Sequence, residues 1–154
     1  MIKEEVETGN WAIPHYTFPD QQRVNYQQVS KWHISPNGKY LNKNLVFLVG
    51  HNTISYGETC AELISHYKLG TTIGHYTAGT NGNINFSGAG KLQMVWTGMK
   101  VLNRDGSPYH GVGVKPDILV SPSIKDIRAN KDTQVEAAVN YLKDQQLELL
   151  RSHQ

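Results

Sequence analysis

The sequence predicts an α/β fold in which a mixed sheet contains one strand–helix–strand unit. Five apolar residues in a row, Leu45 to Val49, predict a short strand, and apolar residues recur at helical spacing from Tyr56 onward. Thr71 to Gly74 then has the composition of a second strand. These three elements form a βαβ unit, for which a right-handed crossover is expected. Flanking helices and a β-hairpin farther along the chain complete the predicted architecture.

The first 44 residues have no clear periodic pattern and form an irregular lead-in segment. Prolines, tryptophans and an Asn37-Gly38 turn signal are interspersed with polar residues there. Only Asp20 to Trp32 has the spacing of a short helix, with Asp20 as its cap. So long a stretch without regular pattern is unusual inside a compact domain. We therefore divide the chain into a lead-in, residues 1–44, and a main unit, residues 45–154.

Within the βαβ unit, the strand and the helix have recognisable limits. Apolar and polar residues do not alternate in the strand, which predicts that both of its faces are buried. The helix ends near Leu69, because Gly70 suits the left-handed position that follows a helix. Its apolar stripe is Tyr56, Cys60, Leu63, Ile64 and Tyr67.

Residues 83–120 are rich in predicted strands. Leu92, Met94 and Trp96 recur at every second position, which predicts a half-buried strand with these three side chains in the core. Asn103 to Gly106 predicts a hairpin turn, with a return strand near Tyr109 to Val114. Further short strands are expected at 83–86, 99–102 and 118–120.

Helices are expected at the end of the chain. Residues 123–128 have room for one or two helical turns, and Asp132 is placed to cap a final helix that frays after Gln145. The apolar face of this last helix is Val135, Ala138, Val139, Leu142 and Leu149.

Composition excludes several classes of function. No apolar run in the 154 residues approaches the roughly 18 of a membrane-spanning helix, and the charged N-terminus lacks the apolar stretch of a signal peptide. The net charge of +2 is scattered, which leaves no basic stripe for nucleic acid. The single Cys60 excludes an internal disulfide. None of the seven histidines has a metal-ligand spacing, so we expect no metal.

Ser55 lies where the first strand gives way to the helix. Free backbone N–H groups at a helix N-terminus favour developing negative charge, so a serine presented there is suited to nucleophilic attack. A simpler interpretation is that Thr53 or Ser55 is only an N-cap. The spacing of these residues does not decide between the two.

Three stretches, in order, resemble the C-terminal processing (tail-specific) serine peptidases. Asn52 to Glu58 is similar to their Ser-Ala-x-Glu motif after a strand, and Ile73 to Gly82 is similar to Ile-Gly-Glu-x-Thr-x-Gly. Asp105 to Asp117 is similar to Gly-x-Gly-Ile-x-Pro-Asp. The resemblance covers about residues 44–146 and extends to the relatives of these enzymes, the tricorn core protease and the retinoid-binding modules. It implies an incomplete ClpP- or crotonase-like core.

The resemblance places the nucleophile at Ser55. The backbone N–H of Tyr56 would then donate to the oxyanion. A loop that borders the site would contain Gly74, Thr77 and Gly79. Glu58 lies one turn after Ser55, at a distance from which it could orient the serine, but interaction with the helix dipole is its expected role.

The identity of the general base is open. Processing peptidases use a lysine in the site loop, but Thr80 stands in its place, and a hydroxyl cannot accept the proton at neutral pH. The chain is therefore more similar to the tricorn-like branch, which lacks this lysine and takes a histidine from upstream sequence. Either the base lies outside this chain, or His110 faces Ser55, where an ordinary pKa of about 6.5 would suit a base.

The resemblance implies a serine-type endopeptidase domain that hydrolyses peptide bonds through an acyl-enzyme. It implies a polypeptide substrate, no cofactor, an extracytoplasmic location in the periplasm or cell envelope, and compatibility with a homo-oligomer. The family's glycine-rich oxyanion segment has no counterpart in residues 1–44. We therefore expect the C-terminal part of a catalytic domain, active in a longer parent and inactive alone. The alternatives are an inactive binding module on the same fold, or a structural piece with an exposed apolar face.

Overall fold

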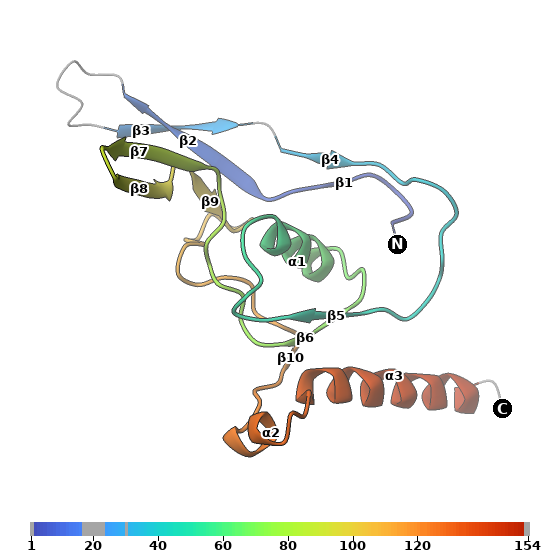
Figure 1. Cartoon of the computed structure of the whole chain (residues 1–154). Helices are drawn as coiled ribbons and strands as arrows, with labels where there is room; N and C mark the ends of the chain where they lie inside the picture. Colours follow the sequence, from blue (N-terminus) through green and yellow to red (C-terminus); the bar gives the residue numbers. More distant parts are fainter. Residues whose placement is uncertain (1, 17–23, 30, 153–154) are drawn as a thin grey trace.

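The structure is a computed structural model of the whole chain, and it describes residues 2–16, 24–29 and 31–152. A parallel sheet of three short strands holds the βαβ unit (Figure 1). Its strands are β5 (Val46–Val49), β6 (Thr71–Gly74) and β10 (Ile118–Leu119), in the order β10-β6-β5.

Two helices lie on opposite faces of this sheet, as Figure 1 shows. The connection between β5 and β6 is α1 (Tyr56–His66), and the opposite face is covered by α3 (Thr133–Ser152). Side chains of α1 such as Ala61 and Leu63 are buried, together with Ile73 of β6. The predicted α/β fold with a βαβ unit and flanking helices is confirmed, but the described strands of the sheet that holds this unit are all parallel, whereas a mixed sheet was predicted.

The first strand of this unit is less buried than predicted. Strand β5 pairs only with β6 among the described strands, so it lies at an edge of the sheet. Val49 is buried, but Leu48 is exposed. Burial on both faces is therefore wrong for β5, because full burial requires neighbours that an edge strand does not have.

The lead-in segment contains strands rather than irregular chain. Strands β2 (Asn10–Tyr16) and β3 (Val24–Val29) pair with each other, and β2 also pairs with β9 (Lys100–Leu102), all antiparallel. Two short strands, β1 (Val6–Glu7) and β4 (His33–Ile34), form a second antiparallel pair. The helix expected at residues 20–32 is wrong for 24–29, because pairing with β2 satisfies this backbone; Asp20 lies outside the described residues.

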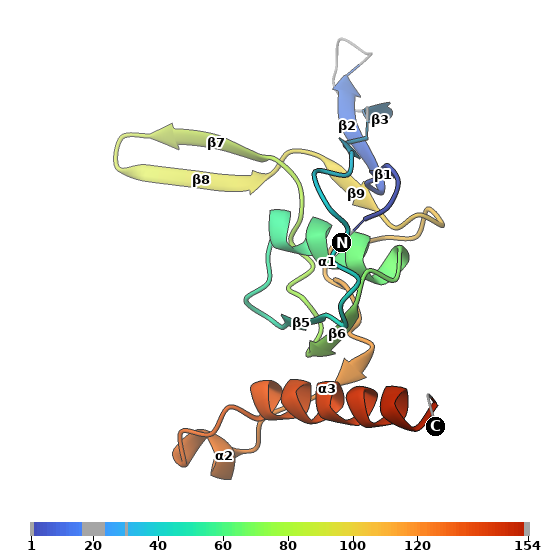
Figure 2. The same cartoon turned by 90° about the vertical axis from the view of Figure 1, so that its right-hand side faces the viewer.

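A two-stranded hairpin extends away from the rest of the fold (Figure 2). It consists of β7 (Ile84–Ala89) and β8 (Leu92–Thr97). Every residue of both strands is exposed. The strand predicted around Leu92, Met94 and Trp96 is confirmed, but the prediction that these side chains belong to the core is wrong, because no described element covers either face.

The expected turn at residues 103–106 forms, but the return strand after it does not. Gly106 N donates to Asn103 O at 2.9 Å, and one isolated bridge joins Leu102 to Pro108. Residues 109–114 then form tight turns, because Gly111 and Gly113 have φ angles of 75° and 72°, in the left-handed region.

The ends of the helices differ in part from expectation. After α1 the left-handed position is Lys68, with φ 52°, and not Gly70. Gly70 instead meets β5 closely, because a Cβ there would lie 2.7 Å from Leu45 O. The predicted helical turns near 123–128 are confirmed as α2 (Ile124–Arg128).

The last helix is longer and less buried than predicted. The cap at Asp132 is confirmed, because its Oδ1 accepts hydrogen bonds from the backbone N–H groups of Gln134 and Val135. Helix α3 continues to Ser152, so fraying after Gln145 is wrong. Of its predicted apolar face, only Ala138 is buried.

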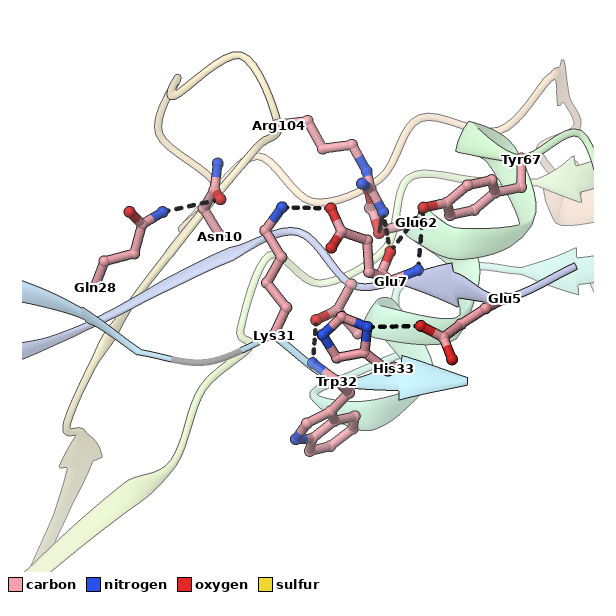
Figure 3. Close-up of polar contacts among 11 residues, drawn as sticks. Glu5, Glu7, Asn10, Gln28, Lys31, Trp32, His33, Glu62, Tyr67 and Arg104 are labelled. Carbon is pink, nitrogen blue, oxygen red and sulfur yellow. Dashed lines mark hydrogen bonds and ion pairs between the residues drawn. The ribbon is translucent and has the colours of Figure 1, made fainter. Parts of the chain in front are cut away.

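An ion-pair cluster ties the N-terminal strands to α1 (Figure 3). The Arg104 guanidinium donates to Glu62 Oε1 of α1 at 2.6 Å and also to the backbone carbonyl of Glu7 in β1. The Tyr67 hydroxyl donates to the same carbonyl at 3.2 Å, and Glu7 N donates to that hydroxyl at 3.1 Å. Partly buried charge-assisted bonds of this kind fix the position of β1 against α1.

A second polar contact joins β10 to β6. The Asp117 carboxylate accepts from the backbone N–H and from the hydroxyl of Thr72, both at 2.8 Å, and Asp117 N donates back to that hydroxyl at 3.0 Å. Burial raises the pKa of Asp117, but the two hydrogen bonds from Thr72 and the positive charge of Lys68 together hold the pKa below its ordinary value of 3.8.

Replacing Gly74 tests the close contact between β6 and β5. Its φ is 137°, and a Cβ would lie 2.0 Å from Val49 O. We expect Gly74→Ala to lower the free energy of unfolding by about 3 kcal/mol or more, from backbone strain and overlap together. Gly90→Ala is the matched control, because Gly90 also has a positive φ but has open space around it. This substitution should lower the free energy of unfolding by about 1–2 kcal/mol. Denaturant titration measures both, and equal losses would contradict the contact.

Acidification tests the contact between Asp117 and Thr72. Since the folded-state pKa is depressed, this carboxylate contributes stability above pH 3.8 that is lost as the pH falls through the folded-state pKa. We expect unfolding titrations between pH 6 and pH 2 to show a smaller loss of stability for Asp117→Asn than for the unmodified chain. Parallel profiles would show that this contact does not contribute.

Candidate active site

Ser55 stands at the N-terminus of α1 in a strained backbone conformation. Its φ and ψ are 50° and −118°, a region that residues with a side chain rarely adopt. The residue is exposed, and its side chain makes no cap hydrogen bond to α1. The backbone N–H of Tyr56, the first helical residue, donates to no acceptor among the described residues. A hydroxyl and a free N–H therefore lie together at the positive end of the helix.

Thr53 has a local role instead of a role in capping α1. Its hydroxyl accepts a hydrogen bond from Gly50 N at 3.1 Å, and its own N–H donates to Gly50 O at 2.8 Å. These bonds close the turn between β5 and Ser55.

The carboxylate of Glu58 organises the loop that borders Ser55. It is fully buried, and it accepts three hydrogen bonds from one short segment. The Thr77 hydroxyl donates to Oε1 at 2.6 Å, as does Gly79 N at 2.6 Å, and Thr80 N donates to Oε2 at 2.9 Å. Three donors around one side chain match an ionised carboxylate, which only accepts.

The same loop is bonded directly to the backbone of Ser55. Ser55 N donates to Thr80 O at 3.2 Å, and Ala78 N donates to Thr53 O at 3.1 Å. Thus four of the residues predicted for the site, namely Ser55, Thr77, Gly79 and Thr80, lie in one hydrogen-bonded unit, and Tyr56 follows Ser55 directly in the chain. Gly74 lies at the start of this loop, at the end of β6.

Residues 109–114 support the loop from its other side. Gly111 N donates to Gly79 O at 2.9 Å, and Val114 N donates to the Thr77 hydroxyl at 2.7 Å. A Cβ on Gly113 would lie 2.6 Å from Thr77 O, so only glycine fits here. Burial, followed by the negative charge of Glu58, raises the pKa of the adjacent Tyr109 hydroxyl well above its usual value.

His110 comes from this supporting segment but is bonded elsewhere. Its ring is exposed, and its Nε2 lies 3.3 Å from Met99 O. The Ser55 hydroxyl makes no hydrogen bond within the described part of the chain, whether to His110 or to another side chain. The role of His110 as a base stays a prediction.

A hollow of about 600 Å³ opens at the carboxyl ends of β5 and β6. The rings of His51 and His75 face each other there, with centroids 4.1 Å apart, and the buried Nδ1 of His75 has no hydrogen-bond partner in the part of the chain that the structure describes. Thr53 and Gln134 also line the hollow. The carboxyl ends of parallel strands are the usual location for ligands in open α/β sheets.

Glu58 has a larger structural role than its position in the sequence predicts. We expected a first-turn carboxylate that interacts with the helix dipole, and it is instead the buried acceptor that holds the loop. The signal was its place in the Ser-x-x-Glu motif. The number of donors it binds depends on a loop that is 19 to 22 residues away.

Two further features concern ligands and membranes. Residues 2–16, 24–29 and 31–152 contain no group of three or more metal-ligating side chains placed to hold an ion. Nor does any helix within these ranges have the length and apolar character needed to cross a bilayer.

Comparison with known proteins identifies the family. The model of peptidase family S41 matches residues 6–120, which is more than half of the chain. The chain therefore belongs to peptidase family S41, and its resemblance to the C-terminal processing peptidases is confirmed. No curated protein matches the chain.

Solved structures share this fold. A putative peptidase from Parabacteroides merdae ATCC 43184 has a TM-score of 0.71 and 20% identity, over 92% of this chain and 44% of that one. Mature CPAF complexed with lactacystin has a TM-score of 0.63 and 18% identity, over 78% of this chain and 23% of that one. A lipoprotein from Streptococcus agalactiae has a TM-score of 0.53 and 16% identity, over 90% and 45%. The chain thus spans less than half the length of each.

Glu58→Gln tests the anchoring of the loop. An amide of the same size would turn a donor toward the N–H of Gly79 or Thr80, and a buried donor without an acceptor costs about 1–3 kcal/mol. We expect that loss in free energy of unfolding, together with faster hydrogen exchange at the amides of Gly79 and Thr80. Glu4→Gln, on an exposed residue, should change stability by less than about 0.5 kcal/mol. Unchanged exchange at these two amides would contradict the anchoring role.

Proposed function

We propose that this S41 domain acts as a serine-type endopeptidase with Ser55 as nucleophile. The observation that carries the proposal is the conformation of Ser55. This residue has a strained backbone, is exposed, makes no capping hydrogen bond to α1, and lies beside the free N–H of Tyr56. An N-cap serine normally has extended backbone and bonds to its helix, so capping does not account for this conformation. Backbone strain of this kind is concentrated at functional sites.

In the proposed reaction, Ser55 Oγ attacks the carbonyl carbon of a peptide bond. The tetrahedral oxyanion accepts a hydrogen bond from Tyr56 N–H at the helix N-terminus. The C–N bond then breaks, the proton from Oγ passes through the base to the leaving amine, and an acyl-enzyme remains. Water hydrolyses the ester and restores the serine. The polypeptide substrate would lie in extended form beside the hollow at the ends of β5 and β6.

We further propose that the 154 residues are the C-terminal part of a catalytic domain in a longer protein. The chain spans 44% of the Parabacteroides merdae structure, and the hydroxyl of Ser55 is hydrogen-bonded to no base among the described residues. A histidine or other base from a further segment would complete the site. The isolated chain would then be inactive, and the whole protein would work outside the cytoplasm, as its likeness to a lipoprotein supports.

A second candidate function is a binding module without catalysis on the same fold. The lack of a hydrogen bond between the Ser55 hydroxyl and any base within the described ranges favours it, together with Thr80 at the position of the family's lysine. This module would bind polypeptide at the same hollow without turning it over. Tail-specific selection of substrate ends would be compatible with either candidate.

A fluorophosphonate probe separates these candidates. In the full-length protein we expect covalent labelling that mass spectrometry locates at Ser55, and labelling should fall at least about a hundredfold in Ser55→Ala. Ser87→Ala, on the exposed hairpin, is the matched control and should label normally. The isolated 154 residues should label far more slowly than the full-length protein. Labelling that persists in Ser55→Ala would overturn the assignment, and a full-length protein that binds peptide without labelling would support the binding module.

A further inference from the structure

Three aromatic rings form a row that ends beside Ser55. Trp11 of β2 packs edge-on against Trp32, with centroids 4.6 Å apart, and Trp32 in turn meets Tyr56 at 5.6 Å. Tyr56 follows Ser55 directly in the chain. The row therefore connects the antiparallel strands to the N-terminus of α1.

The two rings nearest to Ser55 are open to solvent. Trp32 is 44% exposed and Tyr56 is 62% exposed, and Ile54, on the other side of Ser55 in the chain, is 56% exposed. Large aromatic side chains contribute most of their stabilisation when they are buried. Their concentration at an exposed position next to a strained serine is better explained by contact with a ligand than by packing in the core.

The backbone of Trp32 is held rigidly. Its N–H donates to the Thr8 hydroxyl at 3.0 Å, its carbonyl accepts from Thr8 N at 3.0 Å, and Thr8 is fully buried. On either side, Lys31 bonds to Glu7 at 2.6 Å and His33 pairs with Glu7 across the strands. Figure 3 shows the Trp32 ring directed away from Lys31 and Arg104. A surface held in this way loses little conformational entropy when it binds a ligand.

We propose that Trp32 and Tyr56 form an aromatic subsite that selects polypeptides with a large apolar or aromatic side chain next to the cleaved bond. This inference rests on the proposed function. A peptide whose carbonyl is bound by Ser55 Oγ and Tyr56 N–H places its next side chains within about 3.5 Å per residue along the strand. The Tyr56 ring belongs to the same residue as that N–H, so a flanking side chain reaches it, and Trp32 extends the surface. Acidic or small side chains of the peptide would gain no binding energy from these two rings.

Matched peptides test the subsite in the full-length protein. The peptides carry Phe, Ala or Asp at each position that flanks the cleaved bond, and kcat/KM is measured for each. We expect a preference for Phe that falls by about threefold to tenfold in Trp32→Ala and Tyr56→Ala, and that Trp32→Phe largely restores. Trp96→Ala is the control, because Trp96 is similarly exposed at 47% but lies on the hairpin, and it should leave the preference unchanged.

Binding to Ser55→Ala separates this inference from the proposed function. Fluorescence anisotropy of labelled peptides measures their affinity without cleavage, in Ser55→Ala alone and combined with Trp32→Ala or Tyr56→Ala. If nothing is cleaved but the preference for Phe in binding depends on Trp32, the peptidase proposal fails and the subsite stands. If the Phe to Ala ratio is the same with and without Trp32 and Tyr56, in cleavage and in binding, the subsite is wrong. If the Trp32→Ala protein does not fold, Tyr56→Ala still tests the subsite, because the exposed Tyr56 side chain contributes little to packing.

Discussion

The carboxylate of Glu58 is the interaction on which the candidate site depends. A fully buried carboxylate must be hydrogen-bonded, and here its acceptors are filled by the segment from Thr77 to Thr80. That segment bonds to Ser55 N, while the 109–114 segment bonds to it from behind. The N-terminus of α1, the site loop and the glycine-containing turns are thus joined by hydrogen bonds into one unit. The lead-in strands join it where Arg104 donates both to Glu62 and to the backbone carbonyl of Glu7, and Trp32 of the lead-in lies beside Tyr56.

Local patterns were sufficient for the elements whose partners are close in sequence. The βαβ unit, the cap at Asp132 and the turn at residues 103–106 follow from periodicity and from capping chemistry within a few residues. The resemblance to the C-terminal processing peptidases then predicted that Ser55, Thr77 and Gly79 lie near one site, and the structure joins them in one hydrogen-bonded network. Their catalytic roles are proposals that rest on this network.

Elements whose partners lie far away in the sequence could not be predicted from local patterns. The strand at 24–29 depends on pairing with residues 11–16, and its polar sequence shows no alternation that would reveal it. The alternation at Leu92, Met94 and Trp96 did predict a strand, but alternation cannot show whether another element covers it. In the same way, the helical position of Glu58 predicted a dipole interaction, while its burial was decided by a loop about 20 residues later.

The backbone of Ser55 has a consequence for the balance between stability and activity. Glycine adopts a positive φ without strain, whereas a residue with a Cβ at this position lowers the free energy of unfolding by about 1–3 kcal/mol. Since whole domains are stable by only about 5–15 kcal/mol, this is a substantial share for one exposed residue. A glycine at position 55 would make the protein more stable, and it would also remove the hydroxyl. The chain therefore carries a less stable residue where an exposed hydroxyl lies at the N-terminus of α1. The proposed role of Ser55 as nucleophile would account for this as a trade-off between stability and activity.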